Sequence, residues 1–233
     1  MTMQNLRLYK FGKRRHIWEL AHLGRLYLTP AAKYGDPNLA PGAYDPKELV
    51  LEQRLPAGVV FEAYDGKTGQ SKGELKPIEV GPLIAELDTN YYVFCMSCRY
   101  EPGLYAEFHA DTCLVIADPD RFINQACKAI MEALPDWAVD AGTVRYRSPS
   151  ALHTLYPIKQ DIYYGKDKAY EHQYEIRIVC TPPKPVIQLE PMLVSIGNLY
   201  GYSYLTGIES PNSMIECEHS DSLGSPFKIG EVS

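Results

Sequence analysis

The stretch that decides the fold is residues 172–180, HQYEIRIVC, in which polar and apolar side chains alternate along one predicted strand. On that strand Gln173, Glu175 and Arg177 share one face, and the residues between them take the other. Three polar groups in a row are costly to bury in an apolar strand without partners. The row therefore indicates either a functional cleft or an exposed sheet face that carries a Glu–Arg pair.

Further strands are predicted on both sides of this stretch. They lie within residues 5–11, 25–28, 48–55, 58–66, 73–87, 91–100, 113–118, 142–147, 159–165, 185–199 and 199–208. Two clear helices are predicted over residues 14–23, with Gly24 as the stop, and over residues 120–134, with a shorter one within 101–109. The sum is an α+β chain in which antiparallel strands dominate.

The composition is that of a folded globular chain. It has 233 residues, 45% of them hydrophobic, a net charge of −6 and 18 tyrosines, which excludes disorder, collagen and coiled coil as the main state. We expect one domain over residues 1–208, followed by an acidic, Ser-rich segment, 209–233, that is packed on the surface or mobile. No apolar run of about 18 residues and no signal-peptide core is seen, so we expect no membrane partner and a cytoplasmic location.

Charge is concentrated at the amino-terminal end. Residues 1–35 hold seven basic residues against Glu19 alone. The acidic total argues against a bulk nucleic-acid binder, but this basic patch, which includes Arg14 and Arg15, permits a phosphate-bearing ligand. The alternative interpretation is an ordinary solvated helix face.

Residues 31–47 are predicted to form a long loop, because they contain three prolines and two glycines. Loops of this length without regular structure are often functional. No metal site is predicted, because Cys95 and Cys98 lack a second ligand pair and the histidines form no metal-binding pattern.

Several short motifs occur in a recognisable order. They are LYKF (8–11), Leu28-Thr29-Pro30 leading to Gly35-Asp36-Pro37, Phe94–Ser97, Leu104–Phe108, Cys113–Asp118 and Tyr170 to Arg177. Together they resemble a poorly characterised family of bacterial and phage proteins, several of them linked to abortive-infection loci. The chain has Tyr105, Glu107 and Gln173 where that family has Trp, His and Glu.

The same order is similar to that of the ADP-ribosyltransferase superfamily. The resemblance implies a split β-sandwich with helices packed outside, and NAD as co-substrate. It implies that Glu175 stabilises the ribosyl cation, Ser97 shapes the nicotinamide pocket and Gln173 orients the acceptor. The cofactor-binding residues that it implies are Lys10, Arg7, Tyr9, Tyr100 and Tyr105, with loop 31–47 as a flap.

Three functions follow from these observations. The first is an NAD-dependent ADP-ribosyltransferase-like effector in phage defence or toxin action, which modifies a protein or nucleic-acid acceptor. The second is a non-enzymatic module, such as a phage-encoded inhibitor or sensor, that binds a nucleotide or a partner. The third is a hydrolytic toxin that uses His109, Asp111 and a carboxylate.

Overall fold

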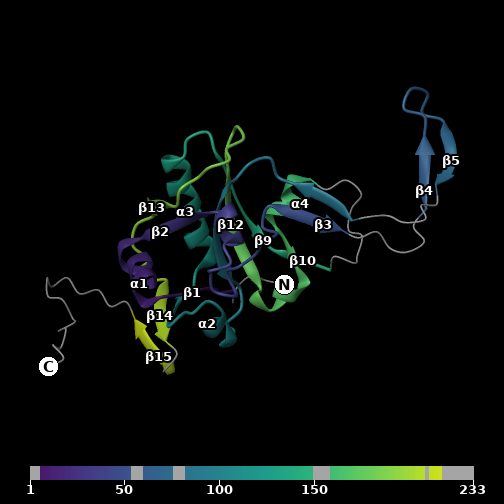
Figure 1. The fold of residues 1–233 in the computed structure, drawn as a ribbon. Helices are drawn as coiled ribbons and strands as arrows, with labels where there is room; N and C mark the ends of the chain where they lie inside the picture. The colour runs from purple at the N-terminus through teal and green to yellow at the C-terminus, as the bar shows by residue number, and fades with distance from the viewer. Residues whose placement is uncertain (1–5, 54–59, 76–81, 149–157, 208–209, 217–233) are drawn as a thin grey trace.

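The core of the molecule is a nine-stranded antiparallel sheet with a few helices, so the chain has an α+β fold (Figure 1). The computed structural model describes residues 6–53, 60–75, 82–148, 158–207 and 210–216. Within this part of the chain, no helix is long and apolar enough to cross a membrane.

Helices and strands alternate irregularly along the chain. They are β1 (Leu8–Gly12), α1 (Arg14–Leu23), β2 (Arg25–Pro30), the 3-10 helix η1 (Ala31–Gly35), β3 (Val50–Gln53), β4 (Phe61–Tyr64), β5 (Ser71–Leu75), β6 (Leu83–Glu86), β7 (Tyr92–Ser97), α2 (Gly103–Glu107), β8 (Thr112–Ile116), α3 (Pro119–Ala133), β9 (Ala138–Thr143), β10 (Arg145–Arg147), α4 (Lys159–Tyr163), β11 (Gly165–Asp167), the 3-10 helix η2 (Lys168–Gln173), β12 (Glu175–Thr181), β13 (Met192–Ser195), β14 (Ser203–Gly207) and β15 (Ser210–Glu216).

Strand β7 is the branch point of the sheet. One edge pairs with β12 along its whole length, from Ser97 opposite Glu175 to Tyr92 opposite Cys180. The other edge is shared, because β2 pairs with it at Tyr92 and Val93 and β1 pairs with it at Ser97. From there β2 leads to β13, whereas β1 leads to β8, β14 and β15. The sheet therefore divides along the middle of β7.

The two predicted helices are confirmed. Helix α3 begins where the Asp118 carboxylate accepts the backbone N–H of Arg121, with Pro119 in the first turn. Its fully buried residues, Phe122, Ala126 and Ile130, recur at helical spacing and pack into the main core. Helix α1 does the same with Ile17, Leu20 and Ala21, so both helices close the core against the sheet.

The strand predicted over residues 159–165 is wrong. Residues Lys159–Tyr163 form helix α4, because Asp161 accepts the backbone N–H of Ile158 and so begins a helical turn. Its other carboxylate oxygen accepts a 2.6 Å hydrogen bond from Arg147 on β10. This second contact comes from a distant segment, which the local pattern of residues 159–165 does not contain.

The carboxyl-terminal boundary also differs from the prediction. Strand β15 pairs with β14, so the sheet continues beyond residue 208, and the rest of the acidic segment, 217–233, lies outside the described residues.

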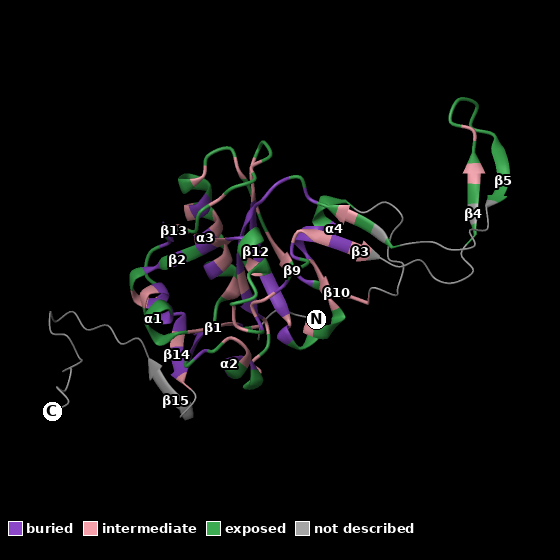
Figure 2. Cartoon of the chain, viewed as in Figure 1, coloured by how far each residue is buried: buried purple, intermediate pink, exposed green. Residues whose placement is uncertain are grey.

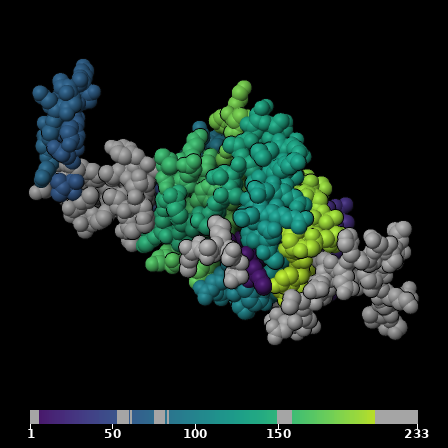
Figure 3. Space-filling view, turned by 180° about the vertical axis from the view of Figure 1, so that it is seen from behind, coloured from purple at the N-terminus to yellow at the C-terminus, as the bar shows by residue number. Residues whose placement is uncertain are grey.

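The hairpin formed by β4 and β5 stands apart from the nine-stranded sheet in the views from both sides (Figures 1 and 3).

The turn after α1 requires glycine for two separate reasons. Gly24 has φ +62, and a Cβ there would overlap the backbone of Gly197. We expect Gly24→Ala to lower the free energy of unfolding by more than the roughly 1–2 kcal/mol that a left-handed residue alone costs. Urea denaturation measures this difference.

Substitutions at two other glycines distinguish the cost of the left-handed conformation from the cost of the steric overlap. Gly201 has φ +78 but open space around it, and Gly35 has neither constraint. Gly201→Ala should therefore show the conformational cost alone, and Gly35→Ala should stay within about 0.5 kcal/mol of the wild type. Equal losses for Gly24→Ala and Gly201→Ala would contradict the close approach to Gly197.

Candidate functional site

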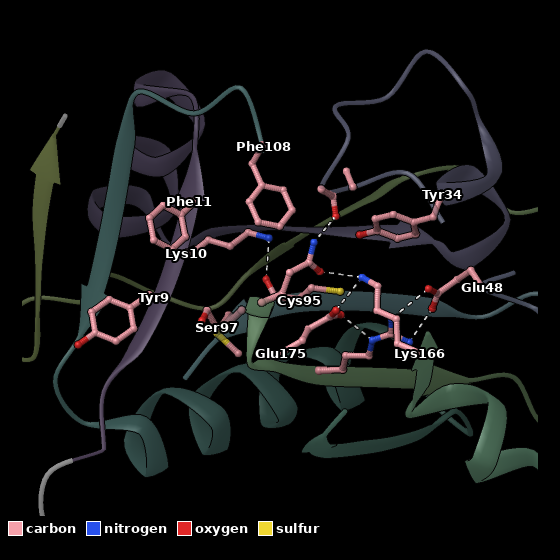
Figure 4. Close-up of a pocket in the computed structure, with 15 residues that line it drawn as sticks. Tyr9, Lys10, Phe11, Tyr34, Glu48, Cys95, Ser97, Phe108, Lys166 and Glu175 are labelled. Carbon is pink, nitrogen blue, oxygen red and sulfur yellow. Dashed lines mark hydrogen bonds and ion pairs between the residues drawn. The ribbon is translucent and has the colours of Figure 1, made fainter. Parts of the chain in front are cut away.

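A cavity of about 120 Å³ lies where the sheet divides (Figure 4). It is lined by residues 9–11 of β1, residues 95–97 of β7 and the polar side chains of β12. Loop 31–47 contributes Gly42, Ala43 and also Tyr34, which lies on η1 at the start of the loop. The walls therefore combine three strands of the sheet with the loop that the sequence singles out.

Arg177 is the most buried charge of the site, with 1% of its surface exposed. Its Nη1 and Nη2 donate to the two oxygens of Glu48 at 2.7 and 3.0 Å, and its Nε donates to Glu175 at 2.6 Å. Nη1 also donates to the Tyr163 carbonyl at 2.8 Å. The polar row of β12 is therefore buried and paired, not an exposed sheet face (Figure 2).

Glu175 is held as a carboxylate. One oxygen accepts the bond from Arg177, and the other accepts a 2.9 Å bond from Nζ of Lys166 on β11. Burial alone would raise its pKa, but the two cations outweigh burial and hold the pKa well below its ordinary value. The group thus stays charged across the physiological range, although only 6% of the residue is exposed.

The pKa of Glu48 is shifted in the opposite direction. Burial raises its pKa to about 6, and this effect exceeds the opposing attraction of Arg177. Its Oε1 also accepts a 2.9 Å bond from the hydroxyl of Tyr91. Glu48 therefore joins the end of loop 31–47 to the buried Arg177 through a group that titrates near neutral pH.

Gln173 is a positioning residue, because its amide is bonded on both sides. Its Oε1 accepts from Lys166 at 2.9 Å and its Nε2 donates to the Gly42 carbonyl at 3.0 Å. Only 3% of the residue is exposed. It therefore ties β11 to the loop.

The backbone between Gln173 and Glu175 is not a strand, which corrects the prediction of one continuous face. Gln173 ends η2, and Tyr174 is left-handed with φ 45, an unusual conformation for a bulky residue. The Tyr174 carbonyl accepts the backbone N–H of Cys98 at 2.8 Å, which fixes the bend. Strained residues of this kind concentrate at functional sites.

Lys10 supplies a further cation from β1. Its Nζ donates to the Cys95 carbonyl at 2.7 Å, on the stretch of β7 where the sheet divides, and lies 4.6 Å from the centre of the Phe94 ring. Burial lowers its pKa. No ion pair between Lys10 and a carboxylate is found among the described residues, in contrast to Lys166.

Five of the eight residues implied by the resemblance line the cavity: Tyr9, Lys10, Ser97, Gln173 and Glu175. The Ser97 hydroxyl is engaged in its own turn, where it donates to the Arg99 carbonyl at 2.6 Å and accepts the Arg99 N–H.

The other three are not among the lining residues. Arg7 is exposed and donates to the Tyr204 hydroxyl. Tyr105 is buried and its hydroxyl donates to the Thr206 carbonyl, while Tyr100 packs against its ring. Both tyrosines belong to a hydrophobic cluster that also contains Phe11 and Phe108, which do line the cavity.

The residues of the third function lie elsewhere. His109 is exposed and the Asp111 carboxylate accepts the backbone N–H of Arg14, so neither lines the cavity. Among the described residues no group of three or more His, Cys, Asp or Glu side chains could hold a metal ion.

Sequence reasoning missed Glu48, Lys166, Tyr34 and Phe108 as cavity residues. Tyr34 stands in the long loop and Phe108 closes the Leu104–Phe108 motif, whereas the neighbours of Glu48 and Lys166 carry no signal. The chain matches no protein-family model, no curated protein and no solved structure. The site must therefore be interpreted from its own geometry.

The titration of Glu48 predicts an unusual dependence of stability on pH. The folded carboxyl has a pKa of about 6 against an ordinary 4.5, so as pH falls through this window the folded chain takes up a proton before the unfolded chain does. The wild type should therefore gain about 1 kcal/mol, relative to Glu48→Gln, between about pH 7 and about pH 5. Urea denaturation of the wild type and of Glu48→Gln at both pH values gives the change of the free energy of unfolding with pH for each protein.

Glu86→Gln is the control, because Glu86 is an exposed carboxyl on β6. It should keep the slope of the wild type. Parallel pH profiles for the wild type and Glu48→Gln would show that Glu48 does not titrate as described.

Proposed function

We propose that the chain is an NAD-dependent ADP-ribosyltransferase-like enzyme. The observation that carries the proposal is that Lys10, Ser97 and Glu175, from three different strands, line one cavity. The division of the sheet at β7 is what a split β-sandwich of this class would need. The class of reaction is transfer of ADP-ribose from NAD to a macromolecular acceptor, with release of nicotinamide.

Glu175 would act on the ribose. Cleavage of the nicotinamide–ribose bond builds oxocarbenium-like charge, as in glycoside hydrolysis. A buried carboxylate that is already ionised and held by two cations can stabilise that charge without reorganising. A carboxylate has about four acceptor sites. Arg177 and Lys166 use two of them, which leaves room for a ribose hydroxyl.

Lys10 would meet the phosphates. Its ammonium has three donors, and the Cys95 carbonyl takes one. The site holds three cations, Lys10, Lys166 and Arg177, against the carboxylates Glu48 and Glu175, so one positive charge is left for an anion.

The size of the cavity limits what it encloses. About 120 Å³ is less than the roughly 300–1,000 Å³ of a complete ligand pocket, so one ring-sized part of NAD fits within it. Phe11 and Phe108 line the cavity and offer apolar faces to a nicotinamide ring. The adenosine half would lie outside, along loop 31–47, which would act as the flap.

A role in phage defence or as a toxin follows from the resemblance and forms part of the proposal, as does a cytoplasmic location. The acceptor would be a protein or a nucleic acid.

A second function, a non-enzymatic nucleotide- or partner-binding module, is favoured by a specific observation. The Ser97 hydroxyl is engaged with Arg99, and the Gln173 amide is bonded on both sides. Neither group is therefore open for the role on nicotinamide or acceptor that the first function gives it.

Nicotinamide release from NAD tests the first function. Glu175→Gln should lower turnover by about 10²–10³-fold, because the carboxylate would act in the transition state, whereas Lys10→Gln should mainly raise KM. Glu171→Gln, at an exposed neighbour of Glu175, and Lys128→Gln, at an exposed lysine on α3, are the matched controls and should keep wild-type rates.

Lys10→Gln also guards against misfolding, because it leaves the ion pairs of Arg177 intact. If the wild type binds NAD but releases no nicotinamide with any lysate as acceptor, the binding module is favoured. If it neither binds nor cleaves NAD, the proposed enzyme is wrong.

A further inference from the structure

Helix α1 and the neighbouring β2 expose aromatic side chains that the cavity does not use. Trp18 is 38% exposed and Tyr27 is 45% exposed. The Trp18 ring stacks on His22, with centroids 4.7 Å apart and planes 14° apart, and His22 meets Tyr200 edge-on at 5.8 Å. His16 meets Tyr27 in the same way at 6.0 Å. The rings are thus held in place and still present open surface.

Basic side chains lie on the same two elements. Arg15 on α1 and Arg25 on β2 both contact Oε1 of Glu19, at 3.4 and 3.8 Å, and both are exposed whereas the Glu19 side chain is largely covered. Lys13 and Arg14 are also exposed, at the start of α1. This surface is therefore positive on a protein whose net charge is −6.

We propose that this surface, formed by α1, β2 and Tyr200, binds single-stranded nucleic acid. Single strands are bound by exposed aromatic rings, on which bases stack, next to cations that follow the phosphates. Both features occur here within one helix and its neighbours. A negatively charged partner is also the one that a local positive patch on an acidic protein would attract. The proposal does not rest on NAD chemistry.

Fluorescence anisotropy with labelled single-stranded DNA and RNA oligonucleotides of about 12 nucleotides tests it, with the full chain and no NAD. We expect a Kd of roughly 1–100 μM at about 50 mM salt, which weakens about tenfold at about 200 mM salt if some three phosphates are contacted. Trp18→Ala should weaken binding by about tenfold, and Trp18→Phe should restore most of it because the phenyl ring still stacks.

The charge is tested by Arg15→Glu, with Lys128→Glu on the exposed side of α3 as the control of equal charge change. Arg15→Glu should weaken binding by several-fold and reduce the salt dependence, and Lys128→Glu should do neither. The proposal is overturned if no oligonucleotide binds at about 50 mM salt, or if both Glu variants act equally. It is also overturned if the surface instead joins two copies of the chain, seen as a dimer that Trp18→Ala dissociates.

Discussion

The structure depends on one buried guanidinium. Arg177 lies in the middle of β12 and carries a charge that burial would make prohibitively costly without partners. Glu48, Glu175 and the Tyr163 carbonyl supply those partners from three separate segments. Removing one partner of such a pair typically costs about 3–5 kcal/mol, because the other charge stays buried. The position of loop 31–47 and of α4 is thus fixed by the same contact that shapes the cavity.

The pairing of Arg177 with Glu175 also explains why the side chains of the site are held in fixed positions. Lys166 completes the pairing of Glu175 and, through Gln173, holds the loop at Gly42. The carboxylate that would meet the substrate is therefore rigid and charged before any ligand arrives, which is the arrangement that electrostatic catalysis requires. Of the three cations that line the cavity, Lys10 is the one for which no carboxylate partner is found among the described residues. In the proposed function, Glu175 would face the positively charged nicotinamide end of NAD, and Lys10 would face its phosphates.

Local patterns predicted the parts of the molecule that local physics controls. Helix α3 follows from its apolar period and its Asp118 cap, and the polar row of β12 was visible in residues 172–180. The predictions that failed concern residues whose hydrogen-bond partners lie elsewhere in the sequence. Glu48 lies 129 residues from Arg177, and α4 depends on a contact from Arg147. The stretch around each residue does not contain its partner, since Arg147 lies 14 residues before Asp161, so neither Glu48 nor the helical state of 159–163 could be predicted.

The measurement that tests the central claim most directly is a titration of the ¹⁹F-phenylalanine-labelled chain with NAD, followed by NMR. Phe108 lines the cavity, whereas Phe122 lies in the main core on α3. The account predicts a saturable shift of the Phe108 signal, assigned with Phe108→Leu, while the Phe122 signal stays in place. No shift of Phe108 at saturating NAD, or equal shifts of both signals, would contradict the assignment of this cavity to NAD.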